Sequence, residues 1–455
     1  MFINVLRLDY DEGIFMYIAY RYHDVSIFNG IANNFHYFFD IPLNQPPVVS
    51  LFYVILYKIV PFNYFYGRLA NVLISTLTIL LIYLTAKTLF NDNNKAILSS
   101  LVAAIDPNFS MGILINMDAI TGLMFVLAVF LTIMTIKYNE NKHHILAGVI
   151  FGLCMLTKWT LAIIPISYVV FYIYYQFRIS EEPDKNYLKK LLFAIISALI
   201  VFLPWFLLMA VNGNLSVLFN HVSRFNFLTT LNDLFKTWLN SPILLILGLI
   251  SFPYIFIQFP KYRFFLIYGI VIIYPFYLIM PRYHDYSTVL YCVVLMSAEI
   301  LYIIFSDTIK LLTILKNSKF KLDNIQINLY QLYNVVLIFM IIFINSGIVI
   351  EHVGFEKDQT VQLVASYIQN TTDKNVTIIS TPEFGVLLFP RSYINVYENK
   401  VVNDSYLIYN YQTHNQQNIT RGVDKGVLDY GNNVYNFTRI KRINDVVIYH
   451  ITIIP

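Results

Sequence analysis

Charged residues are scarce in this chain. Only 13% of its 455 residues are Asp, Glu, Lys or Arg, about half the share that is typical of a soluble domain. Hydrophobic residues make up 57% of the chain, and the mean hydropathy is +0.60. This composition argues against a soluble protein and indicates an integral membrane protein. The formal net charge of +4 is small and gives no support for nucleic-acid binding.

Cysteine is nearly absent as well. The only two, Cys154 and Cys292, each lie inside an apolar segment, so we expect neither a disulfide nor a metal-thiolate site. The aromatic share of 17%, mostly Tyr and Phe, suits membrane interfaces and is no sign of a cofactor. The residues identify no cofactor, and a requirement for a divalent cation stays open.

Long apolar runs recur from Tyr64 to Ile350. Runs of about 20 residues cross a bilayer as helices, because a helix satisfies its own backbone hydrogen bonds. The sequence therefore predicts an α-helical polytopic membrane protein. The expected spans, about ten by these lengths, are 64–88, 96–114, 118–137, 144–157, 159–177, 188–210, 242–259, 264–280, 287–305 and 331–350.

Basic residues predict the orientation of these spans. They gather in alternate loops, which the positive-inside rule places in the cytoplasm. These residues are Lys87, Lys95, Lys137, Lys142, Arg178, Lys185, Lys189, Lys190, Lys261, Arg263, Lys310, Lys316, Lys319 and Lys321. Asn-x-Ser/Thr sequons support this topology, because all fall in segments predicted to be outside. They begin at Asn108, Asn214, Asn370, Asn375, Asn403, Asn418 and Asn436.

The two ends of the chain differ from its middle. Met1 to Leu8 is too short for a span or a signal peptide. Ile14–Asp24 and Val48–Val60 are also too short to span, so we expect helices that lie in the membrane interface. After Ile350 polar residues return, with a helix-like segment at 359–369 and strand-like segments at 376–380, 405–411 and 446–453.

These patterns divide the chain into three parts. Residues 1–63 are expected to form a first extracellular catalytic loop with interfacial helices, and residues 64–350 a transmembrane helical domain. Residues 351–455 are expected to form a small extracellular α/β domain that carries five of the sequons.

Three acids are the first candidates for chemistry. Asp11 and Glu12 are adjacent acids at the predicted outer surface, and Asp118 begins an apolar run at a membrane boundary. Each has an ordinary alternative explanation. Taken alone, Asp11 and Glu12 are more often solvated loop charges, and an Asp at a helix N-terminus is favourable through capping and the helix dipole.

Several cations fall on the same predicted side. Arg68 lies near the outer start of a span, Lys158 interrupts an apolar run, and Arg282 follows Pro281. Such residues commonly anchor a helix at the interface, but a cation that lines a cavity would suit a phosphate. His221 and Arg224, in a later outer loop, are weaker candidates for an acceptor or cavity role.

Acids and cations around one outer cavity suggest sugar transfer. A base must take the proton of the acceptor hydroxyl while a leaving group departs with negative charge, so a carboxylate and phosphate-binding cations are both needed. Nucleotide sugars are cytoplasmic molecules. A site at the outer face would therefore need a sugar carried on a polyprenyl phosphate.

A set of short motifs carries a resemblance to a known family. They are Asp11-Glu12-Gly13, Gln45-Pro46-Pro47, Gly67-Arg68-Leu69, Ile115-Asn116-Met117-Asp118, Gly148, Gly152-Leu153, Leu156-Thr157-Lys158, Pro204-Trp205, His221-x-x-Arg224-Phe225 and Arg282-Tyr283. By the order and spacing of these motifs, the chain resembles the GT-C superfamily of membrane glycosyltransferases. The specific likeness is to glycosyltransferase family 39, which includes protein O-mannosyltransferases and aminoarabinose transferases.

The resemblance implies roles for these residues. Asp11 would be the catalytic base with Glu12 beside it, and Asp118 the second acid. Arg68, Lys158 and Arg282 would hold the phosphate of the lipid donor. The reaction would be inverting, from a polyprenyl (dolichyl) phosphate sugar to a protein, glycan or lipid acceptor, in a multi-pass protein of the cell membrane. The many Ile, Asn and Tyr residues and the outer sequons fit an archaeal surface.

The sequence departs from the family pattern in three places. The family has a span before the first acidic loop, so we expect either an upstream start or a loop held only by its interfacial helices. Gln45 stands where many relatives have a basic residue, and Asp285 falls in a stretch that is usually apolar.

Two other classes of function stay open. A transporter or flippase for a lipid-linked sugar would show inverted repeats and acids near the bilayer midplane, whereas these acids lie at the outer edge. A non-catalytic glycan-binding membrane protein would use residues 351–455 as its working part.

Overall fold

The computed structural model describes most of the N-terminal half and part of the C-terminal domain. The described residues are 10–36, 45–105, 117–180, 183–215, 302, 306, 360–372, 378–380, 393–395, 405–410, 425–430, 433–443 and 446–453. The expected spans at 242–259, 264–280, 287–305 and 331–350 lie outside them, apart from residue 302. The candidates His221, Arg224 and Arg282 also lie outside the described residues.

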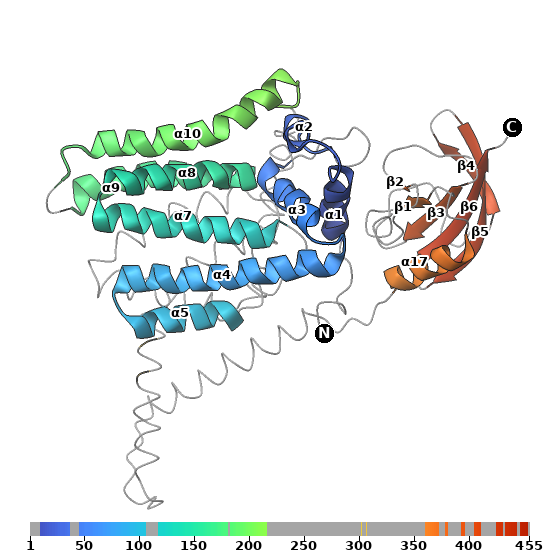
Figure 1. Cartoon of the computed structure of the whole chain (residues 1–455), viewed down its shortest axis with the longest axis horizontal. Coiled ribbons are helices and arrows are strands. Elements are labelled where there is room, and N and C mark those ends of the chain that lie inside the picture. The colour runs from blue at the N-terminus through green and yellow to red at the C-terminus, as the bar shows by residue number, and fades with distance from the viewer. Residues whose placement is uncertain are drawn as a thin grey trace, which may run out of the picture.

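Each expected span between residues 64 and 210 contains a helix, and these helices lie side by side (Figure 1). They are α4 (Tyr64–Phe90), α5 (Asn93–Ile105), α7 (Asp118–Tyr138), α8 (Asn141–Thr157), α9 (Ile163–Arg178) and α10 (Tyr187–Val211). Within the described part of the chain, α4, α7 and α10 are long and apolar enough to cross a membrane. The protein is therefore a multi-pass membrane protein, as the composition predicted.

Asparagine marks several ends of these helices. The Asn63 side chain accepts a hydrogen bond of 2.9 Å from the Phe65 amide and caps the N-terminus of α4. Asn91 and Asn139 end α4 and α7 in the left-handed region, with φ of 54° and 49°. Asn tolerates this conformation better than most residues do, so the chain turns sharply at both places.

Two glycines let α8 and α10 approach closely. A Cβ atom at Gly148 would lie 2.1 Å from the Ala194 carbonyl oxygen, and one at Gly152 would lie 2.7 Å from the Ala198 carbonyl oxygen. Glycines four residues apart share one face of a helix. This small-residue face replaces side-chain packing with close backbone contact, as is common between helices in membranes.

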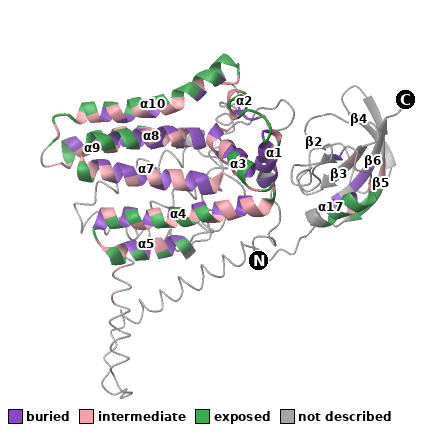
Figure 2. Cartoon of the chain, in the orientation of Figure 1, coloured by how far each residue is buried: buried purple, intermediate pink, exposed green. Residues whose placement is uncertain are grey.

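Three short helices gather at one end of the helical layer: α1 (Tyr10–Arg21), α2 (Ile27–Ala32) and α3 (Pro47–Ile59) (Figure 1). Ile18 of α1 and Tyr53 of α3 pack in one buried cluster with Ala119 and Ile120 of α7. Figure 2 shows α1 largely buried, whereas α4 and α10 expose many residues. The three helices therefore form a cap (residues 10–36 and 45–59) on this end.

The start of α1 corrects the sequence prediction. The expected helix began at Ile14, which placed Asp11 and Glu12 in a loop ahead of it, but α1 begins at Tyr10. Both acids lie in the first turn, where the helix dipole favours negative charge. The helix α2 was not predicted, since its six residues are too few to show a period.

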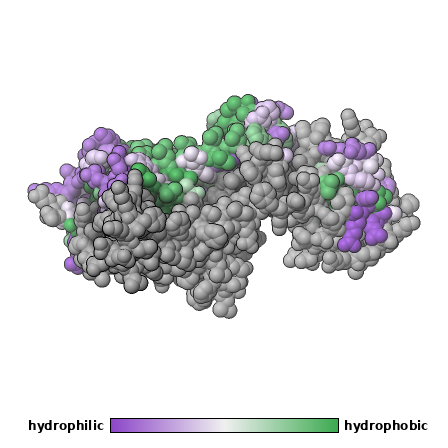
Figure 3. All heavy atoms as spheres, turned by 90° about the horizontal axis from the view of Figure 1, so that it is seen from below, coloured by the Kyte–Doolittle hydropathy of each residue, from purple (hydrophilic) through white to green (hydrophobic). Residues whose placement is uncertain are grey.

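The opposite end carries several basic residues, among them Lys137 and Lys190. Lys137 Nζ donates to the Thr88 carbonyl oxygen at 3.3 Å, which joins the ends of α7 and α4. Lys190 Nζ donates to the Asn139 carbonyl oxygen at 2.6 Å, which joins α10 to the same end. Figure 3 shows hydrophilic atoms at this far end of the helical layer and hydrophobic atoms along its length. The basic end and the cap thus lie at opposite ends of the helical layer.

The C-terminal part contains the helix α17 (Thr360–Thr371) and a six-stranded sheet of order β2-β1-β3-β6-β5-β4. The strands are β1 (Ile378–Ser380), β2 (Tyr393–Asn395), β3 (Ser405–Asn410), β4 (Lys425–Tyr430), β5 (Asn433–Ile443) and β6 (Val446–Ile453). β1 pairs in parallel with β2 and β3, and the remaining pairs are antiparallel. The predicted helix and the predictions of β1, β3 and β6 are confirmed, whereas β2, β4 and β5 were missed.

Candidate functional site

Glu12 and Arg68 form an ion pair inside the cap. Arg68 Nε donates to Glu12 Oε1 at 2.8 Å, and Arg68 Nη2 donates to Glu12 Oε2 at 2.6 Å. Both side chains are fully buried, with 0% exposed. The planar guanidinium and carboxylate match each other at two points, so the pair fixes the first turn of α1 against the first turns of α4.

Two buried tyrosines of α3 lie near this pair. The Tyr53 hydroxyl donates to Asn71 Oδ1 at 2.9 Å, and the Tyr57 hydroxyl donates to the Asn63 carbonyl oxygen at 3.2 Å. Burial raises the pKa of Tyr53 well above its ordinary value, and the negative charges of Glu12 and Asp118 act in the same direction. Tyr53 therefore stays protonated and acts as a hydrogen-bond donor.

Asp118 reaches the same region from α7. It is the first residue of that helix, is half-buried, and lies near enough to Tyr53 for its charge to act on the hydroxyl. Its helix neighbours Ala119 and Ile120 belong to the buried cluster of the cap. The structure thus brings Glu12, Arg68 and Asp118 together around Tyr53, although they are distant in sequence.

Asp11 precedes Glu12 in the first turn of α1. Because Glu12 is held by Arg68, the backbone position of its neighbour Asp11 is set by the same contact.

Lys158 lies at the end of α8, on the side of the cap. Its backbone is extended, with φ of −149° and ψ of 122°, and its side chain is buried. The chain turns here into the short 3-10 helix Trp159–Ala162. Nearby, Leu156 packs with Trp205 and Met209 of α10. This position agrees with the predicted break between two spans at Lys158.

Sequence reasoning missed Tyr53 and Asn71. Asn71 carries a signal that was visible in the sequence: it is an amide in an apolar run, three residues after Arg68 and so on the same helix face. The structure buries this side chain fully. Tyr53 carries no such signal, because tyrosine is common in this chain. Among the residues described, no group of three or more His, Cys, Asp or Glu side chains could hold a metal ion.

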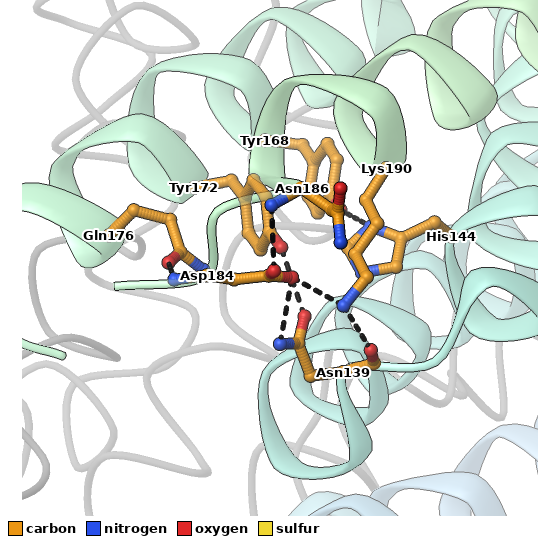
Figure 4. Close-up of polar contacts among 8 residues, drawn as sticks. All are labelled: Asn139, His144, Tyr168, Tyr172, Gln176, Asp184, Asn186 and Lys190. Carbon is orange, nitrogen blue, oxygen red and sulfur yellow. Dashed lines mark hydrogen bonds and ion pairs between the residues drawn. The ribbon is translucent and has the colours of Figure 1, made fainter. Parts of the chain in front are cut away.

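A second polar cluster joins the loops at the basic end (Figure 4). The Asp184 carboxylate accepts hydrogen bonds from Lys190 Nζ, from Asn139 Nδ2 at 3.1 Å and from the Asn186 amide at 2.8 Å. The bond from Lys190 holds the pKa of Asp184 below its ordinary value. The Tyr172 hydroxyl adds a bond of 3.1 Å to Asn139 Oδ1. This cluster connects two loops, those of Asn139 and Asp184, with α9 and α10, and it lies far from Asp11, Glu12 and Asp118.

A family model matches part of the chain. Residues 44–208 match the family described as dolichyl-phosphate-mannose-protein mannosyltransferase. The matched range contains Arg68, Asp118 and Lys158. A search of curated proteins found no match.

Solved structures match almost the whole chain. The structure of ArnT from Cupriavidus metallidurans bound to undecaprenyl phosphate has a TM-score of 0.62 and 14% identity, and covers 99% of this chain and 95% of that one. The oligosaccharyltransferase of Archaeoglobus fulgidus in the apo form has a TM-score of 0.57 and 13% identity, and covers 89% of this chain and 66% of that one. At such identities the likeness is one of fold.

The family match covers residues 44–208, and the shared fold covers almost the whole chain. They confirm the resemblance recognised from the sequence motifs: this chain has the GT-C fold, and its residues 44–208 match the dolichyl-phosphate-mannose-protein mannosyltransferase family.

Proposed function

We propose that this protein transfers a sugar from a polyprenyl phosphate to an acceptor hydroxyl at the outer face of the membrane. The observation that carries the proposal is the convergence of Glu12, Arg68 and Asp118 at the capped end of the helices. The matched family description names a dolichyl phosphate sugar as donor. One structural relative was solved with undecaprenyl phosphate, and the archaeal oligosaccharyltransferase AglB with dolichol-phosphate.

The proposed reaction is one inverting displacement. Asp11 takes the proton of the acceptor hydroxyl, whose oxygen forms a bond to the anomeric carbon of the sugar. The bond from that carbon to the phosphate oxygen breaks, and polyprenyl phosphate leaves with the electron pair and the negative charge. Asp118 supports the base as the second acid.

Arg68 acts in this scheme through Glu12. Its Nε and Nη2 atoms donate to the Glu12 carboxylate and its side chain is fully buried, so we propose that it positions the first turn of α1 rather than holding the donor phosphate. Lys158 and Arg282 then remain the proposed phosphate ligands, since a cation is needed where the leaving group gains charge. His221 and Arg224 remain proposed acceptor or cavity residues.

The proposed orientation in the membrane follows from the position of the basic residues at one end of the helices. The basic end of α4, α7, α8 and α10 is proposed to face the cytoplasm by the positive-inside rule. The cap, Asp118 and the C-terminal domain then face outward. Asp118 at a helix end favours a transferase over a transporter, whose substrate site would lie near the bilayer midplane.

The proposal is tested with the full chain reconstituted in lipid vesicles. A labelled sugar on polyprenyl phosphate should be transferred to acceptor glycans, glycolipids or peptides that are presented at the capped face. The same sugar on a nucleotide should not be used. Transfer from the nucleotide sugar, or no transfer from any lipid-linked hexose or pentose, would contradict the proposal.

A further inference from the structure

Two buried hydroxyl groups near the acids lack a hydrogen-bond partner in the part of the chain that the structure describes. They belong to Ser50 of α3, which is 0% exposed, and Thr121 of α7, which is 1% exposed. A buried hydroxyl without a partner has lost its hydrogen bonds to water and gained nothing in return. Such a group in a folded protein calls for an explanation.

Other buried threonines on these helices behave differently. Thr78 donates to the Ile74 carbonyl oxygen at 2.9 Å, Thr85 to that of Leu81 at 2.6 Å, and Thr132 to that of Ala128 at 2.9 Å. In each case the hydroxyl bonds back to its own helix, which is the usual solution. Thr121 and Ser50 do not use it, so their hydroxyls remain available to another group.

Both hydroxyls share a helix face with a member of the site. Ser50 lies three residues before Tyr53 on α3, and Thr121 lies three residues after Asp118 on α7. Residues at this spacing are neighbours on one face. Tyr53 packs in one buried cluster with Ala119 and Ile120, which directly follow Asp118, so these two faces meet near Asp118. Ser50 therefore lies about one helical turn from Tyr53, and Thr121 about one turn from Asp118.

We propose that Ser50 and Thr121 bind hydroxyl groups of the transferred sugar. The inference rests on the proposed function and names the part of the site that recognises the donor. A serine or threonine hydroxyl both donates and accepts a hydrogen bond, and so does each hydroxyl of a sugar. A phosphate would instead be matched by cations. Two neutral hydroxyls beside carboxylates therefore fit the sugar ring and not the lipid phosphate.

The test compares two threonines on one helix. Thr121→Val removes the unpartnered hydroxyl and keeps the shape of the side chain, and Ser50→Ala does the same on α3. Thr132→Val is the matched control, because Thr132 is equally buried on α7, at 1% exposed, but bonds to Ala128. We expect the KM for the lipid-linked sugar to rise about tenfold in Thr121→Val and Ser50→Ala, with the KM for the acceptor unchanged.

Thermal unfolding supplies a second readout that does not depend on turnover. Without ligand, Thr121→Val should be at least as stable as the wild type, because it removes a buried hydroxyl that has no partner, and Thr132→Val should be less stable. Polyprenyl phosphate should raise the Tm of the wild type and of Thr121→Val equally, because it carries no sugar. The sugar-charged lipid should raise the Tm of the wild type further but add little in Thr121→Val.

The outcomes separate this inference from the proposed function. A wild-type protein that transfers no lipid-linked sugar overturns the proposed function. A wild type that transfers sugar, with Thr121→Val and Ser50→Ala both matching Thr132→Val in donor KM, overturns only the role of the two hydroxyls. A rise confined to the acceptor KM also overturns it, because the hydroxyls would then recognise the acceptor.

Discussion

Glu12 and Arg68 are 56 positions apart in the chain, yet their side chains meet at two points in a fully buried site. The pair joins α1, which carries Asp11, to α4. A buried ion pair adds little net stability, because both charges lose their water. Its consequence is geometric: it sets where the first turn of α1 lies relative to Asp118.

Arg68→Ala should destabilise the protein strongly. The substitution leaves the Glu12 carboxylate buried without its partner, which typically costs about 3–5 kcal/mol. Thermal unfolding in detergent or nanodiscs measures the loss. Arg68→Lys should recover only part of it, since an ammonium cannot reproduce the two-point contact.

A double variant separates geometry from charge. Glu12→Gln combined with Arg68→Met removes both charges, so its stability should lie closer to the wild type than that of Arg68→Ala. Transfer should stay low in the double variant if the pair positions α1. Wild-type transfer by the double variant would show that the pair has no role in the site.

Gly148→Leu should disrupt the packing of α8 against α10. Even a Cβ atom at Gly148 would approach the Ala194 carbonyl oxygen to 2.1 Å, so a larger side chain must separate the helices, at a cost of about 1–3 kcal/mol or more. Leu146→Ala, at an exposed position on the same helix, is the control and should change the Tm little. Equal Tm values for the two variants would contradict the close approach.

Asp184→Asn should weaken the loops at the basic end in a pH-dependent way. The folded pKa of Asp184 is lowered, chiefly by the bond from Lys190. The stabilisation is therefore present above the unfolded pKa, about 3.9, and is lost as the pH falls through the folded pKa. At pH 7 the variant should be less stable than the wild type by about 1–3 kcal/mol. The difference in Tm should shrink below about pH 4, and a difference that stays constant would contradict this account.

Much of the helical fold was predictable from the sequence. Apolar runs predicted α4, α7, α8, α9 and α10, because a segment that crosses the membrane must form its backbone hydrogen bonds within itself. The start of α1 was missed, because acids are expected both in solvated loops and in the first turn of a helix. β5 was missed because its run Thr438 to Arg442 is mostly polar, and its partners β4 and β6 determine its conformation.

The site was predictable as a set of residues but not as a set of contacts. The motifs named Glu12 and Arg68 separately, and nothing in the sequence showed that they pair. The difference between Thr121 and Thr132 is also hidden, because it depends on which hydroxyl bonds to its own helix. Such choices depend on neighbouring helices that one sequence does not reveal.

The measurement closest to the central claim is sugar transfer from a lipid donor by Asp11→Asn and Asp118→Asn in membranes. Asp24→Asn is the control, because Asp24 is an exposed acid in the turn after α1 that bonds to its neighbour His23. We predict that Asp11→Asn lowers kcat by about 100-fold or more, the usual contribution of a general base, that Asp118→Asn also lowers transfer, and that Asp24→Asn transfers sugar at the wild-type rate. Full transfer by both Asp11→Asn and Asp118→Asn would contradict the account.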